Sequence, residues 1–328
     1  MAAGQGVAGP ATRHLSPDRK LNTRHSALWT LDSARRWTQR IAAWLLITLS
    51  GTSYAASIEV IDDLKHPVQL TAPAQRIISL APHITELLYA VGAGDAIVGA
   101  VDYSDYPPPA SRLPRVGGYN GFDIEAIAAL HPDLIIAWRS GNPSPSLASL
   151  ERLRIPIFFS EPREIEDVAT SLERFGILTG HVQQGTNAAA DFRRHLATLQ
   201  QRYKSVARVT VFYEVWNHPL MTVNNQHLIS KVLGLCGGDN IFGTLPALVP
   251  QPDIEAVLQR DPQVIMTGDA GNKHEEFQKY WQRWPSLQAV RNHQLYQVSA
   301  DLLQRHGPRI LDGAEQVCRV LDTVRARR

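Results

Sequence analysis

The chain has 328 residues and a nearly balanced charge, with 33 Lys and Arg residues against 31 Asp and Glu residues. Residues 1–55 hold seven of the basic and two of the acidic residues, so residues 56–328 carry 26 basic and 29 acidic residues, a formal charge of −3. This remainder of 273 residues shows no basic stripe of the kind that nucleic-acid binding requires, and it is long enough for two domains of ordinary size.

The first part of the chain carries the signs of an export signal. Three arginines within residues 35–40 precede the apolar run 41–49, and small residues occupy positions 53 and 55, where a signal peptidase reads them. A positive flank, a short apolar core and a small-residue exit are the parts of a secretory signal. The run of roughly 10 residues is about half of what spans a bilayer. We therefore expect residues 1–55 to be a leader that is removed, with a buried helix over the apolar run as the alternative.

Short apolar strands alternate with helices in the next part of the chain. Thr85 is the candidate cap of the first of these helices. Strands that alternate with helices indicate βαβ units and a parallel sheet. The predicted strands are 76–80, 97–101, 134–137 and 155–159, and the predicted helices are 85–91, 123–130 and 146–153.

Two consecutive helices, 165–178 and 181–206, interrupt this alternation, and the second carries apolar residues at helical spacing. A second alternation follows and ends in a helix over 309–324. The sequence therefore predicts an α/β fold with two doubly wound lobes joined by one long rigid helix. The second alternation consists of strands 208–213, 263–267 and 294–298 and helices 227–233, 253–259 and 275–281. The expected segments are a leader region 1–55, an N-terminal lobe 56–180, a linking helix 181–206 and a C-terminal lobe 207–328.

The chain contains two cysteines, Cys236 and Cys318, and both lie beyond the leader. In an oxidising compartment, an even pair so far apart in sequence indicates a disulfide. The bond would close a loop of about 80 residues and contribute on the order of 4 kcal/mol in the chain-entropy model. Two buried free thiols are the alternative.

Motifs of common enzymes are absent from the sequence. There is no nucleophile elbow and no phosphate-binding loop, and the glycines at 92, 94 and 99 miss the spacing of a dinucleotide site. The histidines lack metal-site spacing, so we expect no metal. His83 falls on a strand-to-helix loop where ligands tend to bind, yet a surface or hydrogen-bonded loop histidine is the preferred interpretation. The sequence thus indicates a binding protein without a cofactor of its own, and not an enzyme.

Aromatic residues gather at the ends of the predicted strands. Tyr103 and Tyr106 follow the second strand, Tyr119 and Phe122 lie in a glycine-bracketed loop, and Trp138 follows the third strand. Open parallel sheets bind their ligands at the carboxyl ends of the strands. Aromatic faces with a few polar tips suit a large, partly apolar ligand. We expect a ligand site here, with rings that merely cover the core as the alternative.

Five segments resemble one family, the periplasmic cobalamin-binding proteins of ABC importers. These segments are 76–92, 103–108, 131–139, 235–242 and 305–310, and the resemblance covers roughly residues 76–324. The first segment also marks the wider group that binds haem and iron–siderophores. The tyrosine-rich second segment and the Ala-Trp-Arg end of the third segment are more specific than the first segment, and they indicate a corrinoid ligand. The family has two α/β lobes around one rigid helix, with the ligand between the lobes, which agrees with the fold predicted from the strand and helix pattern.

The resemblance also implies which residues bind the ligand. Tyr103 and Trp138 would contact the corrin ring from the first lobe, and Asp301 and Arg305 would hydrogen-bond its amide side chains from the second. Val249 stands where a close relative has a pocket tryptophan, and Leu302 and Leu303 replace an aromatic pair, so Trp216 is the candidate for the missing ring. The expected ligand-binding residues are Tyr103, Tyr119, Trp138, Trp216, Asp301, Leu302, Leu303, Gln304 and Arg305.

The resemblance further implies a membrane partner. Glu125 and Glu255 match the two acidic residues, one in each lobe, that meet arginines on the permease, and Cys236 and Cys318 match the disulfide pair of the family. The expected partners are a corrinoid and the permease of an ABC importer with its ATPase, and the expected state is a monomer in the periplasm. A haem or iron–siderophore carrier, with Tyr103 or His83 as an axial ligand, is the first alternative. An exported α/β enzyme is the second.

Overall fold

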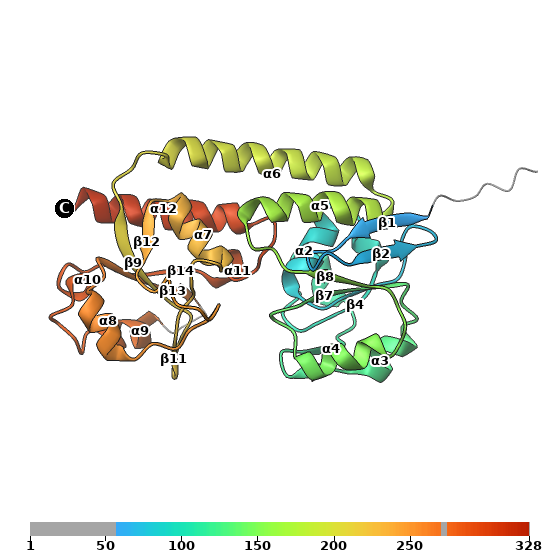
Figure 1. Cartoon of the computed structure of the whole chain (residues 1–328), viewed down its shortest axis with the longest axis horizontal. Coiled ribbons are helices and arrows are strands. Elements are labelled where there is room, and N and C mark those ends of the chain that lie inside the picture. Colours follow the sequence, from blue (N-terminus) through green and yellow to red (C-terminus); the bar gives the residue numbers. More distant parts are fainter. Residues whose placement is uncertain (1–56, 270–273, 328) are drawn as a thin grey trace, which may run out of the picture. The chain divides into compact units, whose positions relative to one another are not determined.

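The structure, a computed structural model, describes residues 57–269 and 274–327 (Figure 1). The predicted leader, residues 1–55, lies outside the described residues. Within the described ranges, none of the helices is long and apolar enough to cross a membrane. The described chain forms two parallel β-sheets with helices packed around them, which confirms the predicted α/β class.

The first sheet has four parallel strands in the order β4-β3-β7-β8. Ile77 and Ile78 of β3 are fully buried and pair with Leu134 and Ile135 of β7. Because parallel neighbours need a crossover connection, helices alternate with these strands as the sequence predicts. The elements of this lobe are β1 (Ile58–Ile61), β2 (Pro67–Leu70), β3 (Ile77–Ser79), α2 (Pro82–Ala90), β4 (Ile97–Ala100), β5 (Gly117–Gly118), β6 (Gly121–Phe122), α3 (Ile124–Ala129), β7 (Leu134–Trp138), α4 (Ser144–Glu151) and β8 (Ile157–Ser160).

The predicted start of the first helix is wrong. α2 begins at Pro82, and its N-cap residue is Ala81. Proline suits the first position of a helix because its fixed φ is helical and an N–H there would lack a partner. Thr85 does not cap the helix. Its hydroxyl lies 2.7 Å from the Ser79 hydroxyl in a buried contact that ties α2 to β3. The correction places His83 inside the first turn of α2 instead of on a loop.

The second sheet also has four parallel strands, in the order β12-β9-β13-β14. β9 and β13 pair up to Glu214 and Thr267, so their carboxyl ends meet at one edge. The sequence does not predict β12, whose residues Gly-Asp-Asn carry no apolar pattern. The elements are β9 (Val209–Glu214), β10 (Trp216–Asn217), β11 (Leu220–Met221), α7 (Leu228–Leu235), β12 (Gly238–Asn240), α8 (Ile254–Arg260), β13 (Val264–Asp269), α9 (His274–Trp281), α10 (Gln288–Arg291), β14 (Leu295–Ser299), α11 (Ala300–Leu303) and α12 (Ile310–Ala326).

Two long helices, α5 (Ile165–Thr179) and α6 (Val182–Tyr203), connect the two sheets. A Cβ on Gly176 would lie 3.0 Å from the Cα of Gly185, so only glycines let the two helices approach this closely. The 22 residues of α6 extend roughly 33 Å at the rise of an α-helix, and in Figure 1 it runs past the helices of both lobes. The predicted long linking helix is confirmed. The boundaries given above for the leader, the two lobes and the linking helix stay predictions.

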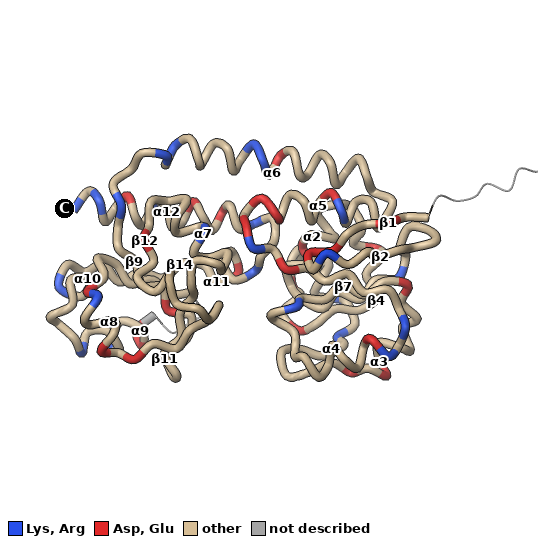
Figure 2. The backbone as a smooth tube through the Cα atoms, viewed as in Figure 1, with Lys and Arg blue, Asp and Glu red and all other residues tan. Residues whose placement is uncertain are grey.

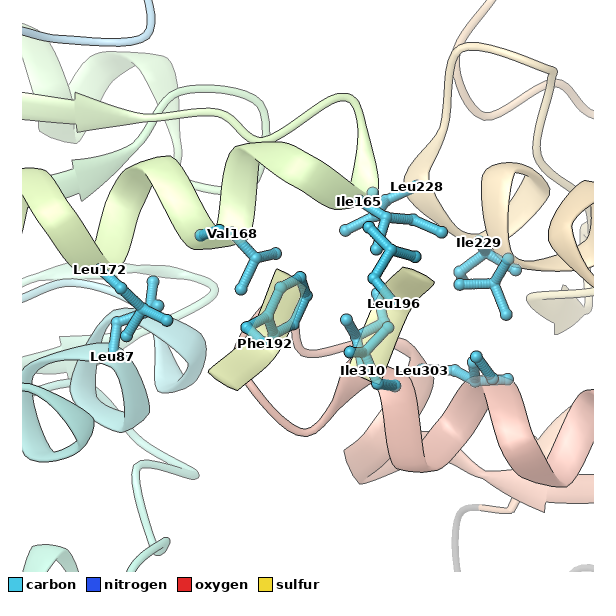
Figure 3. Packing of buried hydrophobic residues seen from close by; sticks show 14 of the residues in the cluster. Leu87, Ile165, Val168, Leu172, Phe192, Leu196, Leu228, Ile229, Leu303 and Ile310 are labelled. Carbon is cyan, nitrogen blue, oxygen red and sulfur yellow. The ribbon is translucent and has the colours of Figure 1, made fainter. Parts of the chain in front are cut away.

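One apolar cluster continues from the first lobe into the second. Figure 3 shows Leu87 of α2 toward one side, Phe192 and Leu196 of α6 in the middle with Ile310 of α12 beside Leu196, and Ile229 of α7 toward the other side. These side chains are at most 6% exposed. Because a packed interior deforms little, the shared cluster holds the two lobes to each other.

Cys236, which follows α7, and Cys318, in α12, form a disulfide, so the predicted bond is confirmed and the free-thiol alternative is wrong. Both residues are fully buried. The bond joins positions 82 residues apart and ties α7 to α12 inside the second lobe.

We expect the double substitution Cys236→Ala with Cys318→Ala to lower the free energy of unfolding by about 4 kcal/mol, because the unfolded chain is no longer closed into a long loop. Guanidinium titration followed by circular dichroism measures this difference. The double variant should also unfold identically with and without reductant, whereas the wild type should lose stability when reduced. Equal unfolding midpoints for the oxidised wild type and the variant would show that the bond contributes nothing.

Candidate functional site

Exposed aromatic rings lie near the carboxyl ends of both sheets. The exposed fractions are 69% for Tyr103, 43% for Tyr106, 76% for Tyr119 and 52% for Trp216. Phe122 behaves differently, because it packs against the core of the first lobe. The rings that are exposed to solvent offer apolar faces to a large ligand. The alternative, in which a ring merely covers the core, applies to Phe122.

The glycine-bracketed loop is a short hairpin that carries Tyr119 at its tip. β5 and β6 pair Gly117 with Phe122 and Gly118 with Gly121, and Gly117 and Gly121 have φ angles of 121° and 151°. A Cβ on Gly117 would lie 2.3 Å from the carbonyl oxygen of Gly121. Both the backbone angles and the close approach therefore require glycine at position 117.

Trp138 ends β7 and is half-buried at the junction of the two lobes. Its ring meets the ring of His83 edge-on at 5.2 Å and that of His306, from the second lobe, at 5.3 Å. The indole nitrogen of Trp138 and Nε2 of His83 are buried without a hydrogen-bond partner among the described residues. The predicted surface loop position of His83 is wrong, since the residue is 1% exposed and lies in the first turn of α2. This burial lowers the pKa of His83 to about 3.

A third histidine completes this cluster. The ring of His227 lies 5.2 Å from that of His306, and its Nδ1 accepts a hydrogen bond from the backbone N–H of Ile229, which caps α7. Burial, helped by the charge of Arg163, lowers the pKa of His227 to about 4. Burial also lowers the pKa of His306 well below its ordinary value. The three histidines are therefore neutral near pH 7 and pack as uncharged rings between the lobes.

The predicted ligand segment of the second lobe spans α11 and the two residues after it. Asp301 and Gln304 are exposed, while Leu302 and Arg305 are half-buried. Leu303 is fully buried and packs in the apolar core. The helical turn thus presents the neighbours of Leu303 toward solvent and turns Leu303 into the apolar core.

Arg305 belongs to an ion-pair network that crosses between the lobes. Its guanidinium donates to Asp105 at 2.7 Å and to Glu86 at 3.3 Å, and it lies 2.8 Å from Asp301. Arg309 donates to both carboxylate oxygens of Glu86, at 2.9 and 2.6 Å. Glu86 is only 4% exposed, so the two arginines neutralise a buried charge.

The same network reaches the tyrosine segment of the first lobe. The Arg309 guanidinium stacks 3.7 Å from the centre of the Tyr106 ring. Burial alone would raise the pKa of Asp105, but the hydrogen bond from Arg305 and the charges of Arg305 and Arg309 together outweigh it and lower the pKa. Sequence reasoning missed Glu86, Asp105 and Arg309, because nothing in the local pattern shows that a helix of the first lobe meets residues of the second.

A pocket of about 140 Å³ lies at the carboxyl edge of the second sheet. Glu214 lines it at the end of β9, together with Trp216, Thr267 and Gln304. Val249, at the position of the missing tryptophan, is half-buried. Sequence reasoning missed Glu214, although a signal was present, because a carboxyl residue ending an apolar strand stands at the edge where such sheets bind ligands.

The two predicted docking glutamates have the same local geometry. Glu125 and Glu255 are exposed residues in the first turns of α3 and α8, each two residues after an aspartate N-cap. The side chain of Asp123 accepts from an amide at 2.9 Å, and that of Asp253 does so at 2.7 Å. Figure 2 shows acidic residues on both helices, on the side of the picture opposite α6. The structure thus presents one carboxylate per lobe in an equivalent setting.

Within the described ranges, no group of three or more His, Cys, Asp or Glu side chains is arranged to hold a metal ion. The histidine rings of the junction meet one another at aromatic distances.

Comparison with known proteins places these features in a family. The periplasmic binding protein family matches residues 77–302. A vitamin B12-binding protein of Vibrio cholerae is 42% identical over 252 residues, which cover 76% of this chain and 90% of that protein. A vitamin B12-binding protein of Photorhabdus laumondii is 39% identical over 253 residues, covering 77% of this chain and 90% of its own length.

Solved structures agree with these sequence comparisons. The crystal structure of the periplasmic vitamin B12-binding protein of Vibrio cholerae matches with a TM-score of 0.72 and 42% identity, over 77% of this chain and 98% of that one. A periplasmic heme-binding protein from Roseiflexus sp. RS-1 matches with a TM-score of 0.68 at 20% identity, over 76% of this chain and 99% of that one. The second likeness shows the fold alone.

The histidine cluster generates a prediction about pH. Below about pH 6.5 an unfolded His227 takes up a proton, whereas the folded residue does so only near pH 4, so the free energy of unfolding should fall as the pH drops through this window. His227→Asn keeps a capping side chain but cannot titrate, and it should remove on the order of 2 kcal/mol of this loss.

Urea titrations between pH 7 and pH 4 measure the effect. His131→Asn is the matched control, because His131 is exposed and has a positive φ that asparagine tolerates. If His227→Asn and wild type lose stability in parallel, the histidine is not held neutral by the fold.

Proposed function

We propose that this chain, which belongs to the periplasmic binding protein family, captures cobalamin between its two lobes and delivers it to the permease of an ABC importer. The observation that carries the proposal is the 42% identity to vitamin B12-binding relatives over 252 residues. The exposed rings and the charged segment 301–305 support it, because a flat corrin with amide side chains needs both aromatic faces and hydrogen-bonding groups.

The proposed site joins surfaces from both lobes. Tyr103, Tyr119 and Trp138 would face the corrin from the first lobe, and Trp216 would supply a ring from the second. Asp301 would accept from ligand amide N–H groups, and Arg305, oriented by Glu86 and Asp105, would donate to amide oxygens. The proposed second-lobe contacts are Trp216, Asp301, Leu302, Gln304 and Arg305, and Leu303 is left out because it is fully buried.

The cellular context follows from the family. We propose that residues 1–55 direct export to the periplasm, where a disulfide is stable. The mature protein would act as a monomer composed of lobes 56–180 and 207–328 joined by the helix 181–206. It would release its ligand unchanged, with no catalysis, to a permease powered by an ATPase.

The proposal predicts that Tyr103→Ala weakens cobalamin binding about tenfold, because the truncation removes a ring from the centre of the ligand surface. Isothermal titration of the purified protein with cyanocobalamin measures the change. Tyr103→Phe is the matched control and should bind like the wild type, since it keeps the ring. Tyr103 is 69% exposed, so neither substitution should affect folding.

The same titration decides between cargoes. Binding of haem with a shifted haem absorption band, and no heat with cyanocobalamin, would replace cobalamin by the haem alternative. Cobalamin that returns chemically altered from the complex would point to the enzyme alternative. Equal affinity of wild type and Tyr103→Ala would remove Tyr103 from the site without touching the cargo.

The docking proposal predicts a separation between binding and transport. Glu125→Gln combined with Glu255→Gln should leave the affinity for cobalamin unchanged and reduce uptake at least tenfold, because both carboxylates lose the charge that pairs with permease arginines. Uptake of labelled cobalamin by cells that depend on this protein gives the readout.

Glu151→Gln combined with Glu275→Gln is the matched control. These residues are exposed, one in each lobe, and their replacement removes the same net charge. If the control impairs uptake equally, the effect comes from overall charge. If the docking variant transports normally, Glu125 and Glu255 do not meet the permease.

A further inference from the structure

Glu214 is a buried carboxyl group that no cation of the described residues neutralises. It is 5% exposed, and its Oε2 accepts a hydrogen bond of 2.7 Å from the indole nitrogen of the fully buried Trp281. None of the ion pairs among the described residues includes Glu214. Glu86 is equally buried, yet two arginines hold it. A buried carboxyl with no cation has no structural need to be charged.

Burial has the expected effect on titration. It raises the pKa of Glu214 to about 7, although the hydrogen bond from Trp281 opposes the rise. A large share of the molecules therefore carries a neutral carboxylic acid at pH 7. Such a group both donates and accepts hydrogen bonds, whereas a carboxylate only accepts them.

The pocket beside Glu214 has room for a small group and not for a macrocycle. Its volume of about 140 Å³ is below the range of pockets that enclose whole drug-sized ligands. Gln304 lines it opposite the strand ends, and Gly268 makes room for this side chain, because a Cβ on Gly268 would lie 2.6 Å from the Gln304 amide nitrogen. The pocket thus offers a carboxyl group and an amide group to whatever enters.

The remaining polar groups of the pocket determine what can enter. The Thr267 hydroxyl donates to the backbone oxygen of Glu214 at 3.0 Å, so its proton is already used. Oε2 of Glu214 accepts from the Trp281 indole, and among the described residues no hydrogen bond to Oε1 competes with a ligand. A primary carboxamide can donate its N–H to Oε1 and accept from the Gln304 amide or from the acid proton. A ligand carboxylate would instead place a second carboxyl in the same pocket, where two like charges cannot both ionise.

Resting on the proposed function, we propose that Glu214 recognises a peripheral carboxamide of the bound corrinoid and selects against analogues that carry a carboxylate at that position. Trp216 and Gln304, which line the pocket, also belong to the proposed ligand surface, so the pocket opens where a corrin side chain would arrive. Glu214 is in this sense a specificity-determining residue, and the ring contacts supply most of the affinity.

The probes are cyanocobalamin and its separated monocarboxylic acids, in each of which one peripheral carboxamide is hydrolysed. Wild type should bind one of these isomers at least tenfold more weakly than cyanocobalamin. Glu214→Gln keeps the acceptor for Trp281 and turns an amide N–H toward the pocket. It should bind cyanocobalamin more weakly than wild type, because the substitution removes the acceptor for the ligand carboxamide, and bind the disfavoured isomer more tightly than wild type does.

Glu275→Gln is the control, because it removes one exposed carboxylate from α9 next to the pocket without lining it. It should keep the wild-type preference. The selection is overturned if Glu214→Gln binds cyanocobalamin normally and discriminates among the isomers as wild type does, or if Glu275→Gln abolishes discrimination equally. Failure of wild type to bind cyanocobalamin at all would instead overturn the proposed function. Thermal unfolding of each variant shows whether an affinity loss reflects misfolding, and the gain for the carboxylate isomer cannot arise that way.

Discussion

The buried carboxylate of Glu86 sets how the two lobes of this protein meet. It lies on α2 of the first lobe, is 4% exposed, and accepts hydrogen bonds from Arg305 and Arg309 of the second lobe. A buried charge without a partner at this depth would cost several kcal/mol. Arg305 and Arg309 are therefore held next to Glu86 on α2. The chain between α11 and α12 is held in place as a consequence. The proposed ligand contacts of Asp301 and Arg305 depend on that position.

Uncharged tryptophan and histidine rings also pack at the junction of the two lobes, in addition to the ion pairs. His306 of the second lobe meets Trp138 and His83 of the first at ring distances of 5.3 and 5.9 Å, and His227 packs on His306 at 5.2 Å. The apolar cluster of α5, α6 and α12 continues behind them. Charge pairing, uncharged rings and apolar packing therefore act together, and they favour capture of a ligand on preformed surfaces over a large closing motion.

Two glutamates show how environment assigns a role to one residue type. Glu86 and Glu214 are 4% and 5% exposed, so burial does not distinguish them. Two arginines surround the first and make it a structural anchor. Among the described residues, the carboxyl group of Glu214 accepts from an indole N–H and has no cation beside it, and it faces a small pocket, which suits recognition of an uncharged amide. Glu86 holds the two lobes together, and Glu214 is proposed to select the ligand between them.

Local pattern in the sequence was sufficient for the α/β alternation, the long linking helix and the aromatic residues at strand ends, because periodicity and strand direction act over a few residues. The pairing of Cys236 with Cys318 was expected from number and compartment. Tertiary structure alone decided the burial of His83 and the roles of Glu86 and Glu214. Glu86 meets Arg305 across 219 residues of chain, and a local sequence pattern cannot predict a contact that forms only when the two lobes pack together.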